Sequence, residues 1–323
     1  MTDLLDDFFI LEKIKLKQPF NLFLTVQDLR NSYPGFEIYE YAFDRNKFFL
    51  VLERDNVVLP VVVLANSIIN PEIKIYIPLT FQRKANNLKW IIEKVKKVLN
   101  LDIDLNKFYQ KAKRDKVLKK VIRDLQGLTF PATPTYFESL VRAIIEQQLS
   151  YNLTIIIENR FIKKFGSFIK IGKIKYFAFP NPKRLAVAKD NEFQSCGLSQ
   201  RKGEYIRRLS RQIIEGKLNF KELNQLDDKL LIQELKRIKG VGQWTAEYVL
   251  VRGFRRINFT PLDDLFLKKI VAYYYFKNKK KVKDISRLEM EKIFSEISEF
   301  SGLASFYLLS HYNLKVKNKV NND

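Results

Sequence analysis

The spacing of apolar residues changes near residue 100, and this change limits the folds that the chain can adopt. Upstream of it, apolar residues come in short runs rich in β-branched and aromatic side chains, and Ile73, Ile75 and Ile77 alternate with polar or aromatic neighbours. The other runs are NLFLTV (21–26), FEIYEYAF (36–43), KFFLVLE (47–53) and VVLPVVVLA (57–65), with turn-forming residues at RDN (54–56) and NPE (70–72). We therefore expect an antiparallel sheet, with a helix over residues 87–99 packed against it.

Downstream of residue 100, nearly every segment repeats its apolar residues at helical spacing. In FESLVRAIIEQQLS (137–150) the apolar stripe consists of Phe137, Leu140, Val141, Ile144 and Ile145. Another helix is expected to end at Gly166, and two or three more are expected between residues 177 and 216. The predicted fold class is α+β, with a sheet domain over 1–100 followed by a mainly helical part over 101–323.

Composition narrows the chemistry that is open to the chain. The formal net charge is +22, which favours a phosphate-bearing partner, although biased composition alone could supply part of the excess lysine. Cys196 is the only cysteine, so an intrachain disulfide and an all-cysteine metal site are excluded. His311 is the only histidine, which leaves almost no material for a His-based zinc site or a Ser-His-Asp triad. Any catalysis must rest on carboxylates, lysines or aromatic residues. We expect His311 to be a packing or surface residue.

The sequence shows neither a secretory signal nor a run of about 18 apolar residues. We therefore expect an intracellular protein of the cytoplasm or nucleoid that is not secreted and does not bind a membrane. A membrane-surface role for the basic charge is the least favoured alternative, because no long amphipathic helix with a separate basic face is evident.

A glycine turn at IKGVGQWTAEYV (238–249) separates two segments of helical spacing. Gly240 and Gly242 allow a turn that exposes consecutive backbone N–H groups, and the following helix adds its own unpaired N–H donors and positive dipole end. Such a turn can hold a nucleic-acid phosphate without reading the bases. Alternatively, the two glycines only end one helix and begin the next. Trp244 and Tyr248 are four residues apart and share one helix face, where they could contact a flat ligand.

Two adjacent carboxylates follow in TPLDDLFLKKI (260–270). Pro261 interrupts regular structure, and we expect Asp263 to cap a helix that begins at Asp264. On local grounds, a cap and a surface acid explain this pair as well as a functional site does.

Five segments, in this order, resemble the helix-hairpin-helix superfamily of DNA base-excision glycosylases, and in particular its monofunctional 3-methyladenine DNA glycosylase II branch. They are FESLVRAIIEQQLS, CGLSQRKGEYI, LKRIKGVGQWTAEYVLVRG, PLDDLFLKK and FSGLASFYLLSHY. The resemblance covers nearly the whole chain. It implies an amino-terminal sheet domain and a helical core of two subdomains, a helix-hairpin-helix subdomain over 131–254 and a second one formed by 101–130 with 255–323.

The resemblance also implies roles for individual residues. Asp264 matches the catalytic carboxylate, which stabilises the positive charge that develops on the sugar when an N-glycosidic bond breaks. Bifunctional relatives have a lysine at the position of Trp244, so base removal without strand cleavage is implied. The implied base pocket consists of Trp244, Tyr248 and Tyr312, whose rings could attract a cationic alkylated purine.

DNA contacts and an ion site follow from the same resemblance. The residues that match DNA-binding positions are Gly240, Gly242, Thr245, Gln147 and Gln148, and Gln148 occupies the position that fills the gap left by the flipped base. The backbone carbonyls of Lys236, Ile238 and Val241 match a site for Na⁺ or K⁺, while no cofactor is required. The implied partner is double-stranded DNA with damaged bases, bound by a monomer.

Two alternative functions stay open. An enzyme of this fold could act on hypoxanthine, uracil or an oxidised guanine, although neutral bases leave less readily and no proton donor is evident. Alternatively, the chain could be a non-catalytic helix-hairpin-helix DNA-binding protein, and the retention of Asp264 beside aromatic residues argues against this.

Overall fold

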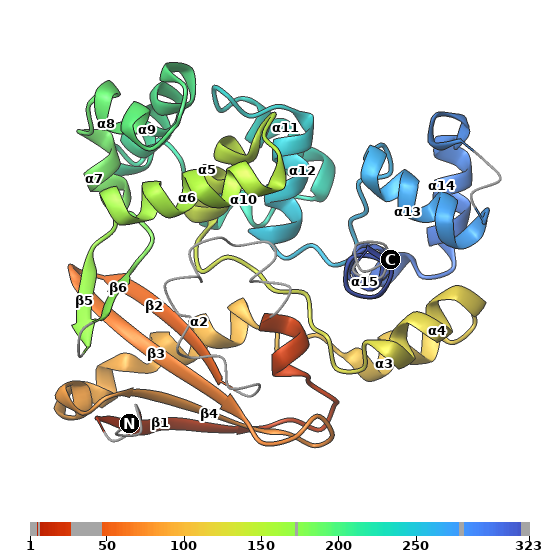
Figure 1. Ribbon diagram of the computed structural model, residues 1–323, viewed down its shortest axis with the longest axis horizontal. Helices are drawn as coiled ribbons and strands as arrows, with labels where there is room; N and C mark the ends of the chain where they lie inside the picture. Colours follow the sequence, from red (N-terminus) through yellow and green to blue (C-terminus); the bar gives the residue numbers. More distant parts are fainter. Residues whose placement is uncertain (1–4, 6, 27–46, 172–173, 278–280, 318–323) are drawn as a thin grey trace.

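The computed structural model describes residues 5, 7–26, 47–171, 174–277 and 281–317. These residues form three lobes, a sheet lobe at the bottom of Figure 1 and two helical lobes above and beside it. None of the helices in this part of the chain is both long enough and apolar enough to cross a membrane.

The sheet lobe contains the expected antiparallel sheet. Its strands are β1 (Phe8–Lys15), β2 (Lys47–Arg54), β3 (Val57–Ala65) and β4 (Glu72–Pro78), in the order β1-β4-β3-β2. The β2–β3 turn places Asp55 and Asn56 at φ values of 52° and 62°, the left-handed conformation that matches the twist of a two-residue hairpin. The turn predicted at 54–56 is therefore confirmed.

Three sequence expectations for this lobe had different outcomes. The strand expected over NLFLTV was wrong, because residues 22–26 are helical and bury Leu22 and Val26 against the sheet. Strand β1 had not been expected. The run FEIYEYAF lies outside the described residues.

Both faces of the sheet are covered. Helix α2 (Lys89–Val98), which follows the 3-10 segment η2 (Leu79–Leu88), packs Ile91, Val95 and Val98 against one face. That face carries Ile73, Ile75 and Ile77, which are fully buried. A strand that is buried on both faces has a nearly continuous run of apolar residues, and the sequence of β3, VVLPVVVLA, is such a run.

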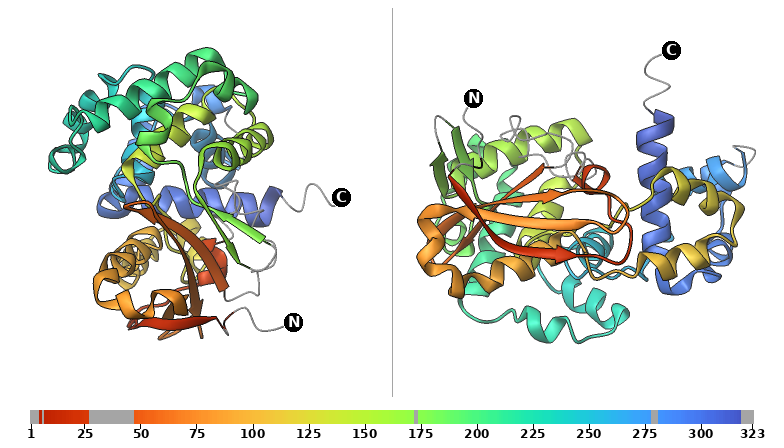
Figure 2. Two further views of the ribbon diagram at one scale, coloured as in Figure 1. Left: turned by 90° about the vertical axis from the view of Figure 1, so that its left-hand side faces the viewer. Right: turned by 90° about the horizontal axis from the view of Figure 1, so that it is seen from below.

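The opposite face is covered by an element that helical periodicity did not predict. Strands β5 (Phe168–Ile171) and β6 (Ile174–Phe177) form an antiparallel hairpin inside the part of the chain that was expected to be helical. Tyr176 and Ala178 pack there with Phe49, Val51 and Val62, and the Tyr176 ring stacks on Phe49 at 5.8 Å. Figure 2 shows this hairpin beside the sheet in both views.

The helical lobes have separate apolar cores. The hairpin lobe comprises α5 (Tyr136–Glu146), α6 (Tyr151–Phe165), α7 (Pro182–Ala186), α8 (Asp190–Ser195), α9 (Gln200–Ile214), α10 (Phe220–Leu223), α11 (Asp228–Lys236) and α12 (Gln243–Arg252). The terminal lobe comprises α3 (Leu105–Ala112), α4 (Lys116–Asp124), α13 (Leu265–Tyr275), η3 (Val282–Asp284), α14 (Arg287–Ser295), η4 (Ser298–Phe300), α15 (Ser301–His311) and η5 (Tyr312–Lys317). The α+β class is confirmed, whereas the domain boundaries at 100, 131 and 254 stay predictions.

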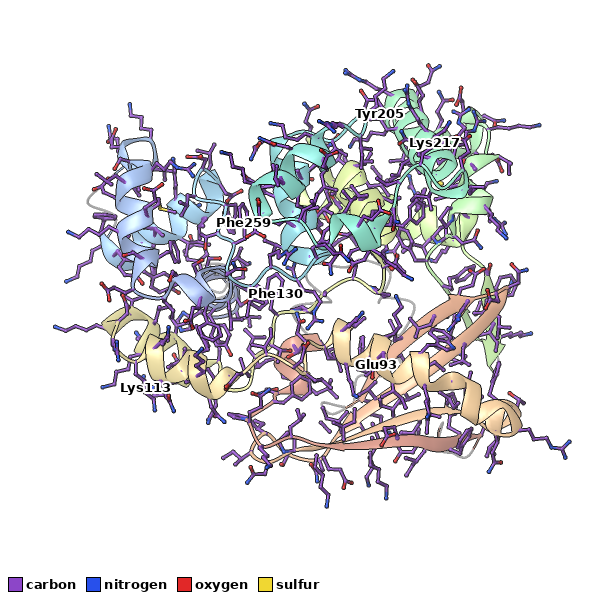
Figure 3. All side chains as sticks on the ribbon, turned by 180° about the vertical axis from the view of Figure 1, so that it is seen from behind. Glu93, Lys113, Phe130, Tyr205, Lys217 and Phe259 are labelled. Atoms are coloured by element: carbon purple, nitrogen blue, oxygen red, sulfur yellow. The ribbon has the colours of Figure 1, made fainter. Side chains whose placement is uncertain are left out.

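The chain passes between the helical lobes at two places, and these crossings are bonded to each other. Arg252 Nη1 donates to the Pro131 carbonyl at 3.0 Å, and the Thr133 N–H donates to the Arg252 carbonyl at 3.0 Å. The Arg252 guanidinium also lies over the rings of Phe130 and Phe306. Figure 3 labels Phe130 near this junction.

Candidate functional site

The glycine turn lies between α11 and α12, and its two glycines meet different constraints. Gly240 has a φ of +92°, and a Cβ there would lie 2.3 Å from Cδ2 of Tyr205, so no other residue fits. Gly242 is the N-cap of α12 with a φ of −92°, and a Cβ there would meet nothing within 4 Å. The lack of a side chain at Gly242 therefore leaves open space in front of the first N–H groups of α12, which is the arrangement that binds an anion.

Gln147 connects the end of α5 to this turn. Its Nε2 donates to the Gly240 carbonyl at 2.8 Å and to Thr245 Oγ1 at 2.8 Å. Thr245 is buried and Gln147 is half-buried, so the polar ends of both side chains bond to the protein. Lys202 Nζ adds a second support by donating to the carbonyls of Ile145 and Gln147 at 2.8 and 2.6 Å, and burial lowers the pKa of this amine.

Gln148 is the residue that this support presents to solvent. It is exposed and has a φ of +57°, a conformation that costs a non-glycine residue about 1 kcal/mol or more. Strain of this kind is often retained where a side chain must project from a surface. Of the five residues predicted to contact DNA, Gly242 and Gln148 are thus the exposed ones.

A cleft of about 690 Å³ joins Trp244 to the two adjacent aspartates that the sequence singled out. Its lining includes Trp244 from α12, Asp264 from the segment before α13, and Arg287 from α14. Figure 3 labels Phe259, another lining residue, between the hairpin and terminal lobes. Trp244 keeps 42% of its surface exposed, which is unusual for so large an apolar side chain and leaves its ring accessible from the cleft.

The two adjacent aspartates have different surroundings. Asp263 is exposed and forms ion pairs with Arg287 at 2.5 Å and with Lys268 at 3.7 Å. Asp264 is half-buried, and its Oδ1 accepts the N–H of Leu267 at 2.7 Å. The cap expected at Asp263 was wrong, because Asp264 is the N-cap and α13 begins at Leu265. The dipole of α13 and this hydrogen bond both stabilise a negative charge on Asp264.

The three predicted pocket aromatics fall into two groups. Trp244 and Tyr248 lie together, with ring centroids 5.5 Å apart. Tyr312 belongs to the terminal lobe, where it packs edge-on against Phe266 and Tyr273. Tyr312 is not among the residues that line the cleft of Trp244 and Asp264.

Glu146 is a polar neighbour of this aromatic wall that sequence reasoning missed. The Tyr248 hydroxyl donates to Glu146 Oε1 at 2.9 Å, and burial raises the pKa of Glu146 to about 7. The apolar pattern gave no signal for it, because Glu146 lies on the face of α5 opposite the apolar stripe, where a solvated acid is expected.

His311, by contrast, is a packing residue as expected. It is buried, its Nδ1 lies 2.5 Å from the Tyr274 hydroxyl, and its Nε2 lies 3.1 Å from Asp124 Oδ2. The bonded His311 side chain lowers the pKa of the Asp124 carboxyl.

The carbonyls of Lys236, Ile238 and Val241 lie where α11 ends and the turn begins. The Ile238 carbonyl accepts the N–H of Val241 at 3.0 Å, so the turn is closed by its own backbone. Neutral oxygen donors at the negative end of a helix suit an alkali cation. The described residues contain no group of histidine, cysteine or acidic side chains that could hold another metal.

Comparison with known proteins identifies the family. A model of the HhH-GPD superfamily of base excision DNA repair proteins matches residues 141–296. The DNA-3-methyladenine glycosylase of Bacillus subtilis (strain 168) is 31% identical over 218 residues, which are 68% of this chain and 71% of that protein. The chain belongs to the HhH-GPD superfamily.

Solved HhH-GPD structures share the fold of this chain. The 3-methyladenine DNA-glycosylase from Archaeoglobus fulgidus aligns with a TM-score of 0.76 at 21% identity. The alignment covers 94% of the present chain and 99% of the A. fulgidus chain. The Clostridium acetobutylicum 8-oxoguanine glycosylase/lyase, in complex with DNA, aligns with a TM-score of 0.65 at 20% identity, over 97% and 99%. The superfamily expected from the motifs is confirmed, and proteins of different specificity have this same architecture.

Proposed function

We propose that this protein is a monofunctional DNA glycosylase that removes alkylated purines of the 3-methyladenine and 7-methylguanine class from double-stranded DNA. The observation that carries the proposal is one cleft lined by both Trp244 and Asp264, an exposed aromatic face and a carboxylate on the first turn of a helix. The 31% identical relative named as a DNA-3-methyladenine glycosylase supports this substrate class over the alternatives.

Binding begins at the DNA backbone. The open N–H groups before α12 hold a phosphate, and the positive net charge strengthens this contact for DNA of any sequence. A damaged nucleotide then leaves the stack, and Gln148 occupies the space that it vacates. The carbonyls of Lys236, Ile238 and Val241 would hold Na⁺ or K⁺, which would link this turn to a phosphate.

Asp264 and the aromatic wall then divide the chemistry. As the bond between the sugar C1′ and the base nitrogen breaks, its electron pair leaves with the base, and positive charge develops on the sugar. The Asp264 carboxylate stabilises that charge, and water adds to C1′ with loss of a proton. An alkylated purine carries a positive charge and departs neutral, so no general acid is required, and the aromatic face binds the cation before it leaves.

Replacement of Asp264 by Asn tests this mechanism. Asp264→Asn keeps the shape and removes the charge, so release of 3-methyladenine and 7-methylguanine should fall by about 100-fold or more. Asp263→Asn is the matched control, because Asp263 is exposed and already paired with Arg287. It should retain most activity. Base release from alkylated duplex DNA is the measurement, with duplex affinity recorded for both variants.

Unchanged base release by Asp264→Asn would contradict the mechanism. A set of duplexes that carry hypoxanthine, uracil or 8-oxoguanine, cleaved with hot alkali after reaction, separates the alternative substrates. Preferential release of any of these neutral bases would contradict the proposed substrate class.

The absence of lyase activity needs a separate measurement, because Lys229 and Lys236 also line the cleft. Trp244 has no amine to form a Schiff base with the sugar. Borohydride should therefore trap no covalent complex with alkylated or abasic DNA. A trapped complex would contradict the monofunctional assignment, and its loss in Lys229→Ala or Lys236→Ala would identify the amine.

A further inference from the structure

Glu146 lies directly behind the aromatic wall of the cleft. It is the last residue of α5, and its Oε1 accepts the hydroxyl proton of Tyr248 from α12 at 2.9 Å. The Tyr248 ring lies 5.5 Å from that of Trp244, which lines the cleft. A single aromatic side chain therefore separates a carboxylate from the ring that faces the ligand.

This carboxylate is fixed from both sides. The next residue, Gln147, is bonded to Gly240 and Thr245, and Lys202 holds the carbonyls of Ile145 and Gln147. The end of α5 thus has little freedom, and the Glu146 oxygen serves as a fixed point for the Tyr248 hydroxyl.

Charged groups from three helices face Glu146. They are Arg142 of α5, Glu158 of α6 and Arg252 of α12, and Glu138 of α5 acts in turn on Glu158. Arg142 forms ion pairs with Glu138 at 2.8 Å and with Glu158 at 2.5 Å, so its positive charge is shared by other acids. Burial raises the pKa of Glu146 to about 7 and that of Glu158 to about 8. Because these acids interact, their protons are released in linked steps across the neutral range.

We propose that Glu146 is a positioning and specificity-determining residue that holds Tyr248 against Trp244 and gives the aromatic wall a preference for positively charged bases. The inference rests on the proposed function. A phenol that donates to a carboxylate has a more electron-rich ring, which strengthens its attraction for a cation. The carboxylate itself acts at a longer range through a half-buried medium, in which its field is weakly screened.

Fluorescence tests the coupling between Glu146 and the wall without any need for catalysis. Trp90 and Trp244 are the only tryptophans, so Trp90→Phe leaves Trp244 as the sole emitter. In this background the Trp244 emission should change with an inflection near pH 7. Adding Glu146→Gln should abolish the inflection, whereas adding Asp264→Asn should leave it in place. An inflection that survives Glu146→Gln, or its absence from the parent, would overturn the proposal, even if the protein proves to be a glycosylase.

Base selectivity tests the second half of the proposal. Glu146→Gln keeps an oxygen that can accept the Tyr248 hydroxyl and removes the charge. Single-turnover release of 7-methylguanine should fall by about tenfold, the effect of a charge roughly 10 Å away at an effective dielectric constant of about 20. Release of neutral hypoxanthine should change by less than about twofold, so the ratio of the two rates should fall.

The variant Glu146→Leu distinguishes charge from position. It also removes the oxygen that accepts the Tyr248 hydroxyl, so it should slow the release of both bases. Tyr248→Phe removes the donor of the same hydrogen bond and should likewise slow the release of both bases. Thermal unfolding of each variant shows whether the fold is retained. Equal losses on both bases with Glu146→Gln would reduce Glu146 to a structural residue and overturn the assignment of specificity.

Discussion

Gly240 and Gly242 are two positions apart in one turn, and each lacks a side chain for a different physical reason. Gly240 is required by the protein itself, since its φ is positive and Tyr205 fills the space where a side chain would be. Gly242 has neither constraint. The free space at Gly242 lies before the first N–H groups of α12, which is compatible with the proposed close approach of a phosphate.

This difference predicts opposite outcomes for two alanine variants. Gly240→Ala should lower the free energy of unfolding by about 2–4 kcal/mol, because the clash with Tyr205 adds to backbone strain. Gly242→Ala should alter stability by less than about 1 kcal/mol and yet weaken duplex binding, because its methyl group enters the phosphate site. Urea unfolding and DNA-binding titrations measure the two effects. Equal loss of stability in both variants would contradict this division of roles.

Gln148 has a backbone conformation that favours glycine. A change to glycine should therefore affect the stability of the protein and its activity in opposite directions. Gln148→Gly should raise the free energy of unfolding by up to about 1 kcal/mol through relief of the left-handed strain. The same change should slow base release, because no side chain then fills the gap in the duplex. Gln148→Ala is the control, since it loses the amide and keeps the strain. A Gly variant with full activity would show that Gln148 does not fill the duplex.

At the same scale, the sequence identified the pair Asp263 and Asp264 but assigned the cap to the wrong one. Adjacent residues at the start of a helix have similar capping preferences, so local sequence cannot say which of them caps. The outcome depends on Arg287, 24 residues further along the chain, whose ion pair holds Asp263 outside the helix. Such long-range contacts are not encoded in local spacing, whereas the turn at Gly240 and Gly242 is.

Among the elements, helices with a clear apolar stripe were predicted correctly, as with α5 and α6. The β5–β6 hairpin was missed even though FIKIGKIKYF (168–177) alternates apolar and lysine residues, a pattern typical of a hairpin. Helical signals on both sides concealed it. The helix at residues 22–26 was mistaken for a strand because a short apolar run fits either structure, and packing against the sheet decides between them.

The buried acids between α5 and α6 give the fold a pH dependence. Burial raises the pKa of Glu158 to about 8, whereas a glutamate in an unfolded chain titrates near pH 4.3, so between these values the folded chain binds more protons. The free energy of unfolding should therefore fall as the pH rises from about 5 to 8. Glu158→Gln removes this titration, so its free energy of unfolding should fall by about 3–4 kcal/mol less than that of the native protein over that range.

Urea unfolding at pH 5, 7 and 8.5 measures this difference. Glu93→Gln, on the exposed side of α2, is the control and should follow the native protein (Figure 3). The same pH slope in Glu158→Gln and in the native protein would show that Glu158 ionises as readily in the folded chain as in the unfolded one.

At the scale of the whole molecule, Tyr176 joins the sheet lobe to the hairpin lobe. It is almost fully buried between them and stacks on Phe49. Tyr176→Ala should lower the free energy of unfolding by about 3–5 kcal/mol, because it leaves a cavity where the two lobes meet. Lys175→Ala, one residue earlier and exposed, should cost less than about 1 kcal/mol.

Calorimetry compares these variants. The Tyr176 variant should also separate the melting of the sheet lobe from that of the helical lobes, because their shared core is lost. A single transition at the native midpoint would show that the β5–β6 hairpin does not couple the two lobes.

The two chain crossings beside Arg252 have a mechanical consequence. The hairpin and terminal lobes are joined at these crossings, where Arg252 bonds to Pro131 and Thr133. Two segments that are bonded side by side bend together as one hinge. Trp244 and Asp264 lie on opposite sides of that hinge. We therefore expect the angle between the hairpin and terminal lobes to set the distance between the Trp244 ring and the Asp264 carboxylate.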